Sequence, residues 1–85
     1  MANHNLQKTT ADLARALVAF PDDVKVEITY EDDHNIELAL TVNPADMGRI
    51  IGRHGRIAKS IRMIIKAASS VYQLRSDVKI VEPAE

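Results

Sequence analysis

The sequence predicts one α+β domain with the element order α-β-β-α-α-β, in which helices pack on one face of a three-stranded mixed sheet. Two patterns predict this class: residues 24–30 and 36–42 alternate apolar and polar side chains like half-buried strands, and other segments repeat with the helical period. Size is the third observation, because 85 residues suffice for a single hydrophobic core. We expect domain 1–85 to have its core at about residues 6–82 and short flexible termini.

The first half of the chain reads as a helix followed by a hairpin. Apolar residues with helical spacing predict a helix from about residue 5 to 19, and Pro21 just beyond cannot continue it. Strands 24–30 and 36–42 are separated only by the polar segment Glu31–Asn35, and so short a connection predicts an antiparallel pair.

The second half begins with a strong helix start, since Asn43 can cap and Pro44 suits the first helical position. This helix must be short, because Gly52–Gly55 interrupts it. A longer helix follows over about 56–70, with an apolar arc that includes Ile64 and Val71 opposite a basic arc. Val78–Val81 reads as the third strand.

Composition excludes several classes of protein. The chain has no cysteine, so disulfides and thiolate zinc sites are ruled out, and its three histidines lack metal-ligand spacing. We therefore expect no metal and no cofactor. No apolar run approaches the ~18 residues of a membrane span, and neither end carries a signal or anchor pattern. We expect a soluble, cytoplasmic protein.

The net charge of −1 conceals a strong asymmetry. Residues 1–46 carry three basic and nine acidic side chains, whereas residues 47–85 carry eight basic and three acidic ones. Between Arg49 and Lys66 there are six bases and no acid. Such a basic sector can bind a polyanion locally.

The segment most informative about function is Gly52-Arg53-His54-Gly55. Glycine tolerates positive φ and lets another backbone approach closely, and the second glycine opens a helix whose N-terminus attracts phosphate. Arg53 and His54 add side-chain donors at the same place. The combination suits a sugar-phosphate backbone on the loop, with bases against the neighbouring aliphatic side chains.

A simpler interpretation is a helix corner with a solvated basic face, and a bare G-x-x-G would favour it. Here Arg56, Lys59, Arg62 and Lys66 are like-charge neighbours three or four residues apart, with no interleaved acid. Each such pair costs on the order of a few tenths of a kcal/mol. A polyanionic partner accounts for that cost better than a purely structural face does.

The run Ile-Ile-Gly-Arg-His-Gly-Arg-Ile (residues 50–57) and the element order resemble KH domains of type II, and specifically the KhpA (YlqC) family of small bacterial RNA-binding proteins. This resemblance implies a type II KH fold with the third strand beside the first, and a groove for about four single-stranded nucleotides. Gly52, Arg53, His54 and Gly55 would form the clamp loop. Ile50, Ile51 and Ile57 would line or support the groove, with residues 38–42 opposite.

The function predicted from these residues is non-enzymatic binding of single-stranded RNA. The predicted RNA-binding residues are Arg49, Ile50, Ile51, Gly52, Arg53, His54, Gly55, Arg56, Ile57 and Lys59. The resemblance further implies an RNA chaperone in post-transcriptional regulation, a KhpB-type KH-containing partner, and a link to cell-wall synthesis and cell shape. The alternative is a protein-interaction or dimerisation module, in which the basic face and Met63 dock an acidic or KH-containing partner and RNA binding is secondary. An enzyme is not expected, because Gly52–Gly55 lacks the length and the Lys-Ser/Thr end of a Walker loop.

Overall fold

The computed structural model describes residues 2–81. Met1 and residues 82–85, to which the expectation of flexible termini refers, lie outside this part, as do the side chains of Ala2 and Arg53. The elements in chain order are α1 (Ala2–Leu17), the short 3-10 helix η1 (Pro21–Asp23), β1 (Lys25–Glu31), β2 (Asn35–Thr41), α2 (Pro44–Ser70) and β3 (Arg75–Val81). The predicted α+β fold with a three-stranded mixed sheet is confirmed. The boundaries of α1 and of the three strands differ from the predicted ones by at most three residues, whereas the two helices predicted after Asn43 form the single element α2.

The strand order in the sheet is β1-β2-β3, with β2 antiparallel to β1 and parallel to β3. The expectation that the third strand lies beside the first is therefore wrong. On the outer edge of β1, the Gln7 side-chain amide of α1 donates to the Val26 carbonyl at 2.7 Å. β3 joins the other side of the hairpin, and the long α2 supplies the crossover of a dozen or more residues that a parallel pair needs.

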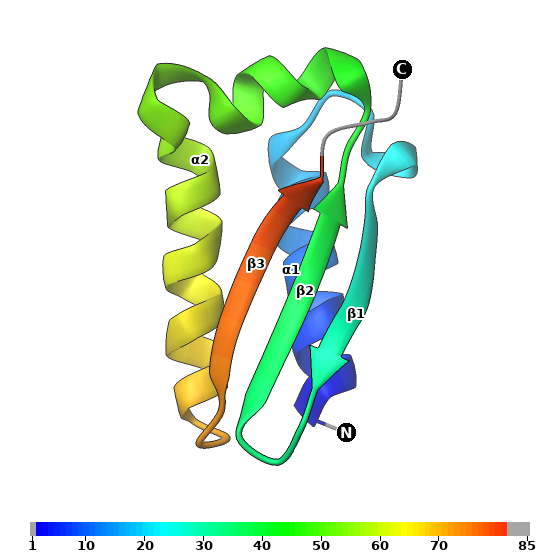
Figure 1. Ribbon diagram of the computed structural model, residues 1–85. Coiled ribbons are helices and arrows are strands. Elements are labelled where there is room, and N and C mark those ends of the chain that lie inside the picture. Colours follow the sequence, from blue (N-terminus) through cyan, green and yellow to red (C-terminus); the bar gives the residue numbers. More distant parts are fainter. Residues whose placement is uncertain (1, 82–85) are drawn as a thin grey trace.

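Both helices lie against the same face of the sheet, α1 across it and α2 along the β3 side (Figure 1). Alternation along β2 turns Ile36, Leu38 and Leu40 toward the helices, where each is at most 2% exposed. The remaining buried apolar residues are Leu6, Ala11, Ala14, Val24, Val42, Ile50, Ala58, Ile61, Ile65 and Val78. This single core fixes the position of α2 relative to the sheet.

Helix α2 bends sharply in its middle (Figure 1). His54 and Gly55 both take left-handed backbone angles, with φ of +65° and +67°. The predicted interruption is thus a corner within one continuous helical element, and no extended loop separates two helices. We call residues 44–53 the first arm of α2 and residues 56–70 the second arm.

The apolar arc predicted on the second arm is only partly buried. Ile61 and Ile65 are inaccessible to solvent, whereas Ile64 is 46% and Val71 79% exposed. These two residues lie at the margin of the arc, about 100° from its buried centre, and no other described element covers that side.

Candidate nucleic-acid interface

The first arm of α2 is fixed at its N-terminus by two side chains. The Asn43 side chain accepts a hydrogen bond from the Ala45 N–H at 2.8 Å, which confirms its predicted role as the cap. The buried Asp46 carboxylate accepts from the backbone N–H groups of Ala19 and Phe20 at 2.9 and 3.1 Å. Asp46 therefore ties the start of α2 to the chain leaving α1, and the position of the first arm follows from this link.

The corner of α2 depends on the conformation of two residues. Gly55 adopts its positive φ without steric cost, because it lacks a Cβ. His54 belongs to the few residue types that are enriched in this region, and its side chain is exposed at the outside of the corner. The corner directs the two arms at an angle to one another and leaves a hollow beside them.

This hollow, the corner pocket, has a volume of about 340 Å³. It is lined by Gly48, Arg49 and Gly52 from the first arm and by Arg56 and Ile57 from the second. Gly48 and Gly52 are four residues apart and so share one face of the helix. A Cβ atom at either position would meet no other atom within 4 Å. The glycines thus leave the helix backbone bare beside open space.

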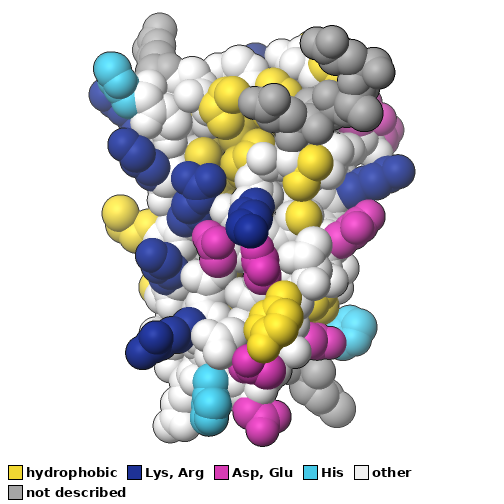
Figure 2. Space-filling model, viewed as in Figure 1, with side chains coloured by type: hydrophobic (Ala, Val, Ile, Leu, Met, Phe, Trp, Pro, Cys, Tyr) yellow, Lys and Arg dark blue, Asp and Glu magenta, His cyan; other side chains and the backbone are white. Residues whose placement is uncertain are grey.

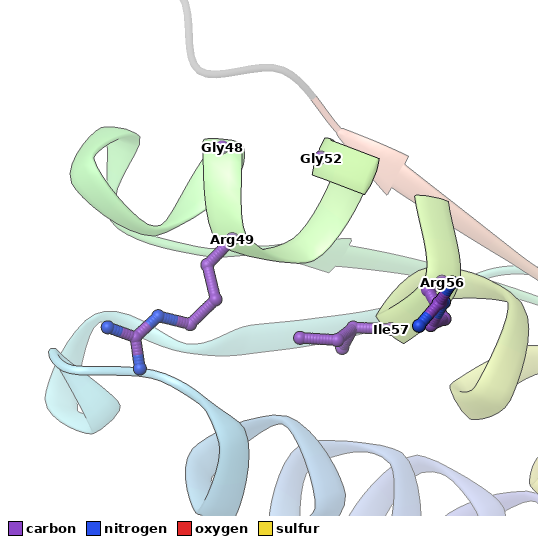
Figure 3. A pocket seen from close by; sticks show the side chains of 5 residues that line it. All are labelled: Gly48, Arg49, Gly52, Arg56 and Ile57. Carbon is purple, nitrogen blue, oxygen red and sulfur yellow. The ribbon is translucent and has the colours of Figure 1, made fainter. Parts of the chain in front are cut away.

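The side chains of the corner pocket combine positive charge with an apolar surface. Figure 3 shows Ile57 extending from the second arm between Arg49 on one side and Arg56 on the other. Both arginines are exposed and Ile57 is half-buried. Guanidinium groups donate hydrogen bonds and accept none, so they suit phosphate oxygens, and an aliphatic side chain suits the face of a base.

Four of the predicted RNA-binding residues meet in the corner pocket: Arg49, Gly52, Arg56 and Ile57. His54 and Gly55 form the adjoining corner, and Lys59 is exposed about one turn further along the second arm. Ile51 is 44% exposed but does not line the pocket. The side chain of Arg53 lies outside the described part of the structure.

Two expectations about apolar contacts need correction. Ile50 is completely buried in the core, so it can support the first arm but offers no surface to a base. Leu38 and Leu40 of β2, and Val42 just after it, are likewise buried, because the alternation of this segment turns them toward the helices. Only the half-buried Ala39 and Thr41 of that segment keep accessible surface.

Gly48 is a pocket residue that the sequence analysis did not predict. Its spacing of four from Gly52 was the available signal, because that spacing places both residues on one side of a helix. The prediction of a clamp loop considered only residues from Gly52 onward, so it did not include Gly48.

Charge is distributed unevenly around the site. Several Lys and Arg side chains line the α2 side of the molecule, whereas Asp and Glu side chains lie over the sheet and at its hairpin end (Figure 2). Among the described side chains, the ion pairs are Lys8–Asp12, Arg15–Asp12 and Lys79–Glu37, and none involves the described bases of α2, which are Arg49, Arg56, Lys59, Arg62 and Lys66. The described basic side chains of α2 therefore keep a positive charge that no acidic partner in these ion pairs neutralises.

The hairpin carries its own ordered carboxylate. Asp32 accepts hydrogen bonds from the Tyr30 hydroxyl at 2.7 Å and from the backbone N–H groups of His34 and Asn35 at 2.8 and 2.7 Å. The Tyr30 hydroxyl and then these donors lower the pKa of Asp32 to about 2. This end of the molecule keeps a negative charge in neutral solution, unlike the corner pocket.

No cluster of three or more His, Asp or Glu side chains in the described part of the chain could hold a metal ion. No described helix has both the length and the apolar character required to cross a membrane.

The family model and the known proteins to which this chain is similar are consistent with the fold and the corner pocket described above. The family model described as "KhpA/KhpB, KH domain" matches residues 7–80. A protein named RNA-binding protein KhpA from Clostridium acetobutylicum is 49% identical over 81% of this chain and 91% of its own length. Proteins with the same name from Halalkalibacterium halodurans and Listeria monocytogenes are 40% and 34% identical, over 82% and 91% of this chain and 91% and 100% of their own lengths. No solved structure gives a significant match.

Proposed function

We propose that this chain, which belongs to the KhpA/KhpB KH-domain family, is a non-enzymatic protein that binds single-stranded RNA in the cytoplasm. The observation that carries the proposal is the corner pocket, where a bare glycine face meets an aliphatic side chain between two arginines. The relatives are named RNA-binding proteins, which supports the same assignment.

In this proposal the corner holds the RNA backbone and the pocket holds a base. Phosphate oxygens contact Arg49, Arg53, His54 and Arg56, helped by the partial positive charge at the start of the second arm. The missing side chains of Gly48 and Gly52 let the strand lie against the helix backbone. Ile57 contacts the base, Ile51 adds apolar surface on the outside, and Ile50 supports the first arm from the core.

Binding through aliphatic contacts and phosphates tolerates many sequences and gives modest affinity. The three aromatic residues, Phe20, Tyr30 and Tyr72, do not line the corner pocket, so base stacking on aromatic rings is not part of the proposed mode. Such binding suits an RNA chaperone, which must release its substrate.

Replacing Arg53 and His54 together by Asp tests the clamp. Two carboxylates would face the phosphates, so affinity for a single-stranded oligonucleotide of about ten nucleotides should fall at least tenfold. Fluorescence anisotropy measures the affinity, and circular dichroism checks that the variant folds.

The matched control places two carboxylates on the hairpin side, by Lys25→Asp and His34→Asp, where both parent side chains are exposed. Its affinity should stay within about threefold of the parent protein. If the folded Arg53/His54 variant binds RNA as well as this control does, the clamp proposal fails.

The finer roles implied by family resemblance belong to the same proposal: post-transcriptional regulation, a KhpB-type partner, and control of cell-wall synthesis and cell shape. Crosslinking of RNA in cells, followed by sequencing, identifies the targets. If the roles depend on RNA, a strain carrying only the Arg53/His54 variant should show the same change in cell shape as a deletion strain. Normal shape in that strain would separate the cell-shape role from the clamp.

A second candidate function is contact with another KH domain, and an exposed apolar stripe on the second arm favours it. The stripe consists of Met63, Ile64, Ala67 and Val71; Met63 is 70% and Val71 79% exposed. Exposed apolar side chains that adjoin one another often mark protein contacts. We propose that this stripe contacts a second copy of the chain or the KH domain of a KhpB-type protein.

Light scattering on purified, nuclease-treated protein tests the apolar stripe. A dimer in the absence of RNA that is lost in Met63→Asp, but kept in Phe20→Asp, would support it; Phe20 is an exposed apolar residue outside the stripe. A monomer that associates only when RNA is added would count against it. Loss of KhpB-type binding in Met63→Asp alone would identify the heteromeric contact.

A further inference from the structure

A row of basic side chains continues from the corner pocket along the second arm of α2. This basic ridge consists of Arg56, Lys59, Arg62 and Lys66. Spacings of three, three and four residues keep them on one side of the helix. A rise of 1.5 Å per residue puts Arg56 and Lys66 about 15 Å apart along the axis. The ridge therefore extends well beyond the corner pocket.

Contacts within the protein account for the position of Arg62 in the basic ridge, but not for the positions of Lys59 and Lys66. The Arg62 Nε donates to the Val78 carbonyl of β3 at 2.9 Å, and this half-buried contact joins the second arm to the edge of the sheet. Lys59 and Lys66 are exposed, and neither ammonium group forms an ion pair or hydrogen bond with another described side chain.

The chain places no acidic side chain near these lysines in sequence, since residues 47–76 contain neither Asp nor Glu. Like charges at such spacing destabilise an isolated helix. Residues 1–46 carry nine acidic side chains, so the chain is not short of acids and their absence from residues 47–76 is local. A ligand that neutralises the ridge explains the arrangement.

Continuity with the corner pocket identifies the ligand. Arg56 belongs both to the corner pocket and to the ridge, so a strand held at the corner has its next phosphates beside Lys59 and Lys66. We infer that single-stranded RNA longer than the clamped nucleotides continues along the basic ridge, with phosphates on Lys59 and Lys66. This inference rests on the proposed function and deepens it, because it specifies the substrate as single-stranded RNA that is longer than the nucleotides held in the corner pocket.

Salt dependence with two oligonucleotides tests the ridge. A tetranucleotide occupies only the corner, whereas a strand of about twelve nucleotides also reaches the ridge. For single strands, the slope of log affinity against log salt changes by about 0.7 for each phosphate contact. Lys66→Gln should therefore flatten the slope for the long strand by about 0.7 and lower its affinity several-fold. Binding of the tetranucleotide should not change.

The matched control is Lys25→Gln, which removes an exposed lysine from β1 and should leave both slopes unchanged. If Lys66→Gln and the double variant Lys59→Gln/Lys66→Gln keep the parent slope for the long strand, the ridge does not bind RNA. That result leaves the clamp intact, provided that the tetranucleotide still binds. Failure of the parent protein to bind either strand would instead overturn the proposed function and the ridge with it.

Discussion

The three glycines of α2 have different conformational needs. Gly55 occupies a left-handed conformation with φ of +67°, whereas neither Gly48 nor Gly52 has a positive φ. Only Gly55 is therefore required by the backbone. The other two cost helix stability and are best explained by the open space that they leave in the corner pocket.

Gly52→Ala should consequently separate stability from binding. Alanine suits a helix better than glycine, and its Cβ meets no atom within 4 Å, so the free energy of unfolding should rise by about 0.5–1 kcal/mol. The methyl group would lie in the corner pocket, so RNA affinity should fall several-fold. Denaturant unfolding and fluorescence anisotropy measure the two effects.

Gly55→Ala serves as the comparison, because a side chain at positive φ costs about 1–2 kcal/mol. This variant should lose stability, in contrast to Gly52→Ala. Unchanged RNA affinity in a stabilised Gly52→Ala protein would show that the strand does not lie against this helix face.

Asp32 gives a prediction for acid solution. Its pKa in the folded protein, about 2, is below the ordinary value of 3.8, so its contribution to stability is complete above about pH 4. The contribution is lost as the pH falls from about 4 to about 2. A carboxyl NMR titration should give the low pKa, and Asp32→Asn should weaken the pH dependence of unfolding in that window. An Asp32 that titrates near 4 would contradict the hydrogen-bonded hairpin.

At the scale of single residues, the sequence predicts which residues belong to the site better than it predicts which of them are exposed to solvent. Residues 52–57 contain the corner and three of the five residues that line the corner pocket, in the segment that the glycine and arginine pattern singled out. The burial of Ile50 beside the exposed Ile51 depends on how the first arm is rotated over the core, which tertiary packing decides. Local sequence does not contain that information.

Among the elements, the junction of α1 and α2 is the one that sets the position of the site. Two backbone N–H groups at the end of α1 donate to Asp46 in the first turn of α2. The carboxylate also lies near the positive end of the helix dipole. A charge buried in this way is stabilised by its donors and holds the first arm in place.

Asp46→Ala should lower the free energy of unfolding by about 2 kcal/mol, because it leaves the N–H groups of Ala19 and Phe20 without their acceptor. Asp12→Ala is the control, since Asp12 forms only exposed ion pairs on α1 and should cost less than about 1 kcal/mol. Chemical denaturation measures both. Equal stability of the two variants would show that the junction does not depend on Asp46.

The elements themselves were largely predictable, because alternation along β1 and β2 and the Asn43-Pro44 helix start are local signals. The order of the strands was not predictable in this way. It depends on which edge of the hairpin the third strand joins, which local sequence does not specify. In the structure, Gln7 of α1 contacts β1 and Arg62 of α2 contacts β3, so helix side chains bind both outer strands of the sheet. The corner of α2 was foreseen as a break, but its sharp form depends on left-handed angles at two successive residues.

For the whole molecule, charge and shape agree on one binding surface. The longest dimension is 35 Å. In Figure 2 the Lys and Arg side chains line the α2 side, whereas Asp and Glu side chains lie over the sheet and at its hairpin end. A polyanion is attracted to one side and repelled from the other, which orients an approaching strand. This asymmetry would allow a chain of net charge −1 to bind RNA in the proposed way.

The most direct test of this account is an NMR titration of the amide signals with a single-stranded RNA of about twelve nucleotides. The account predicts the largest shifts at Gly48, Gly52, Gly55 and Arg56, with smaller shifts at Lys59 and Lys66. Shifts confined to the apolar stripe or to the hairpin around Asp32, with the three glycines unmoved, would contradict it.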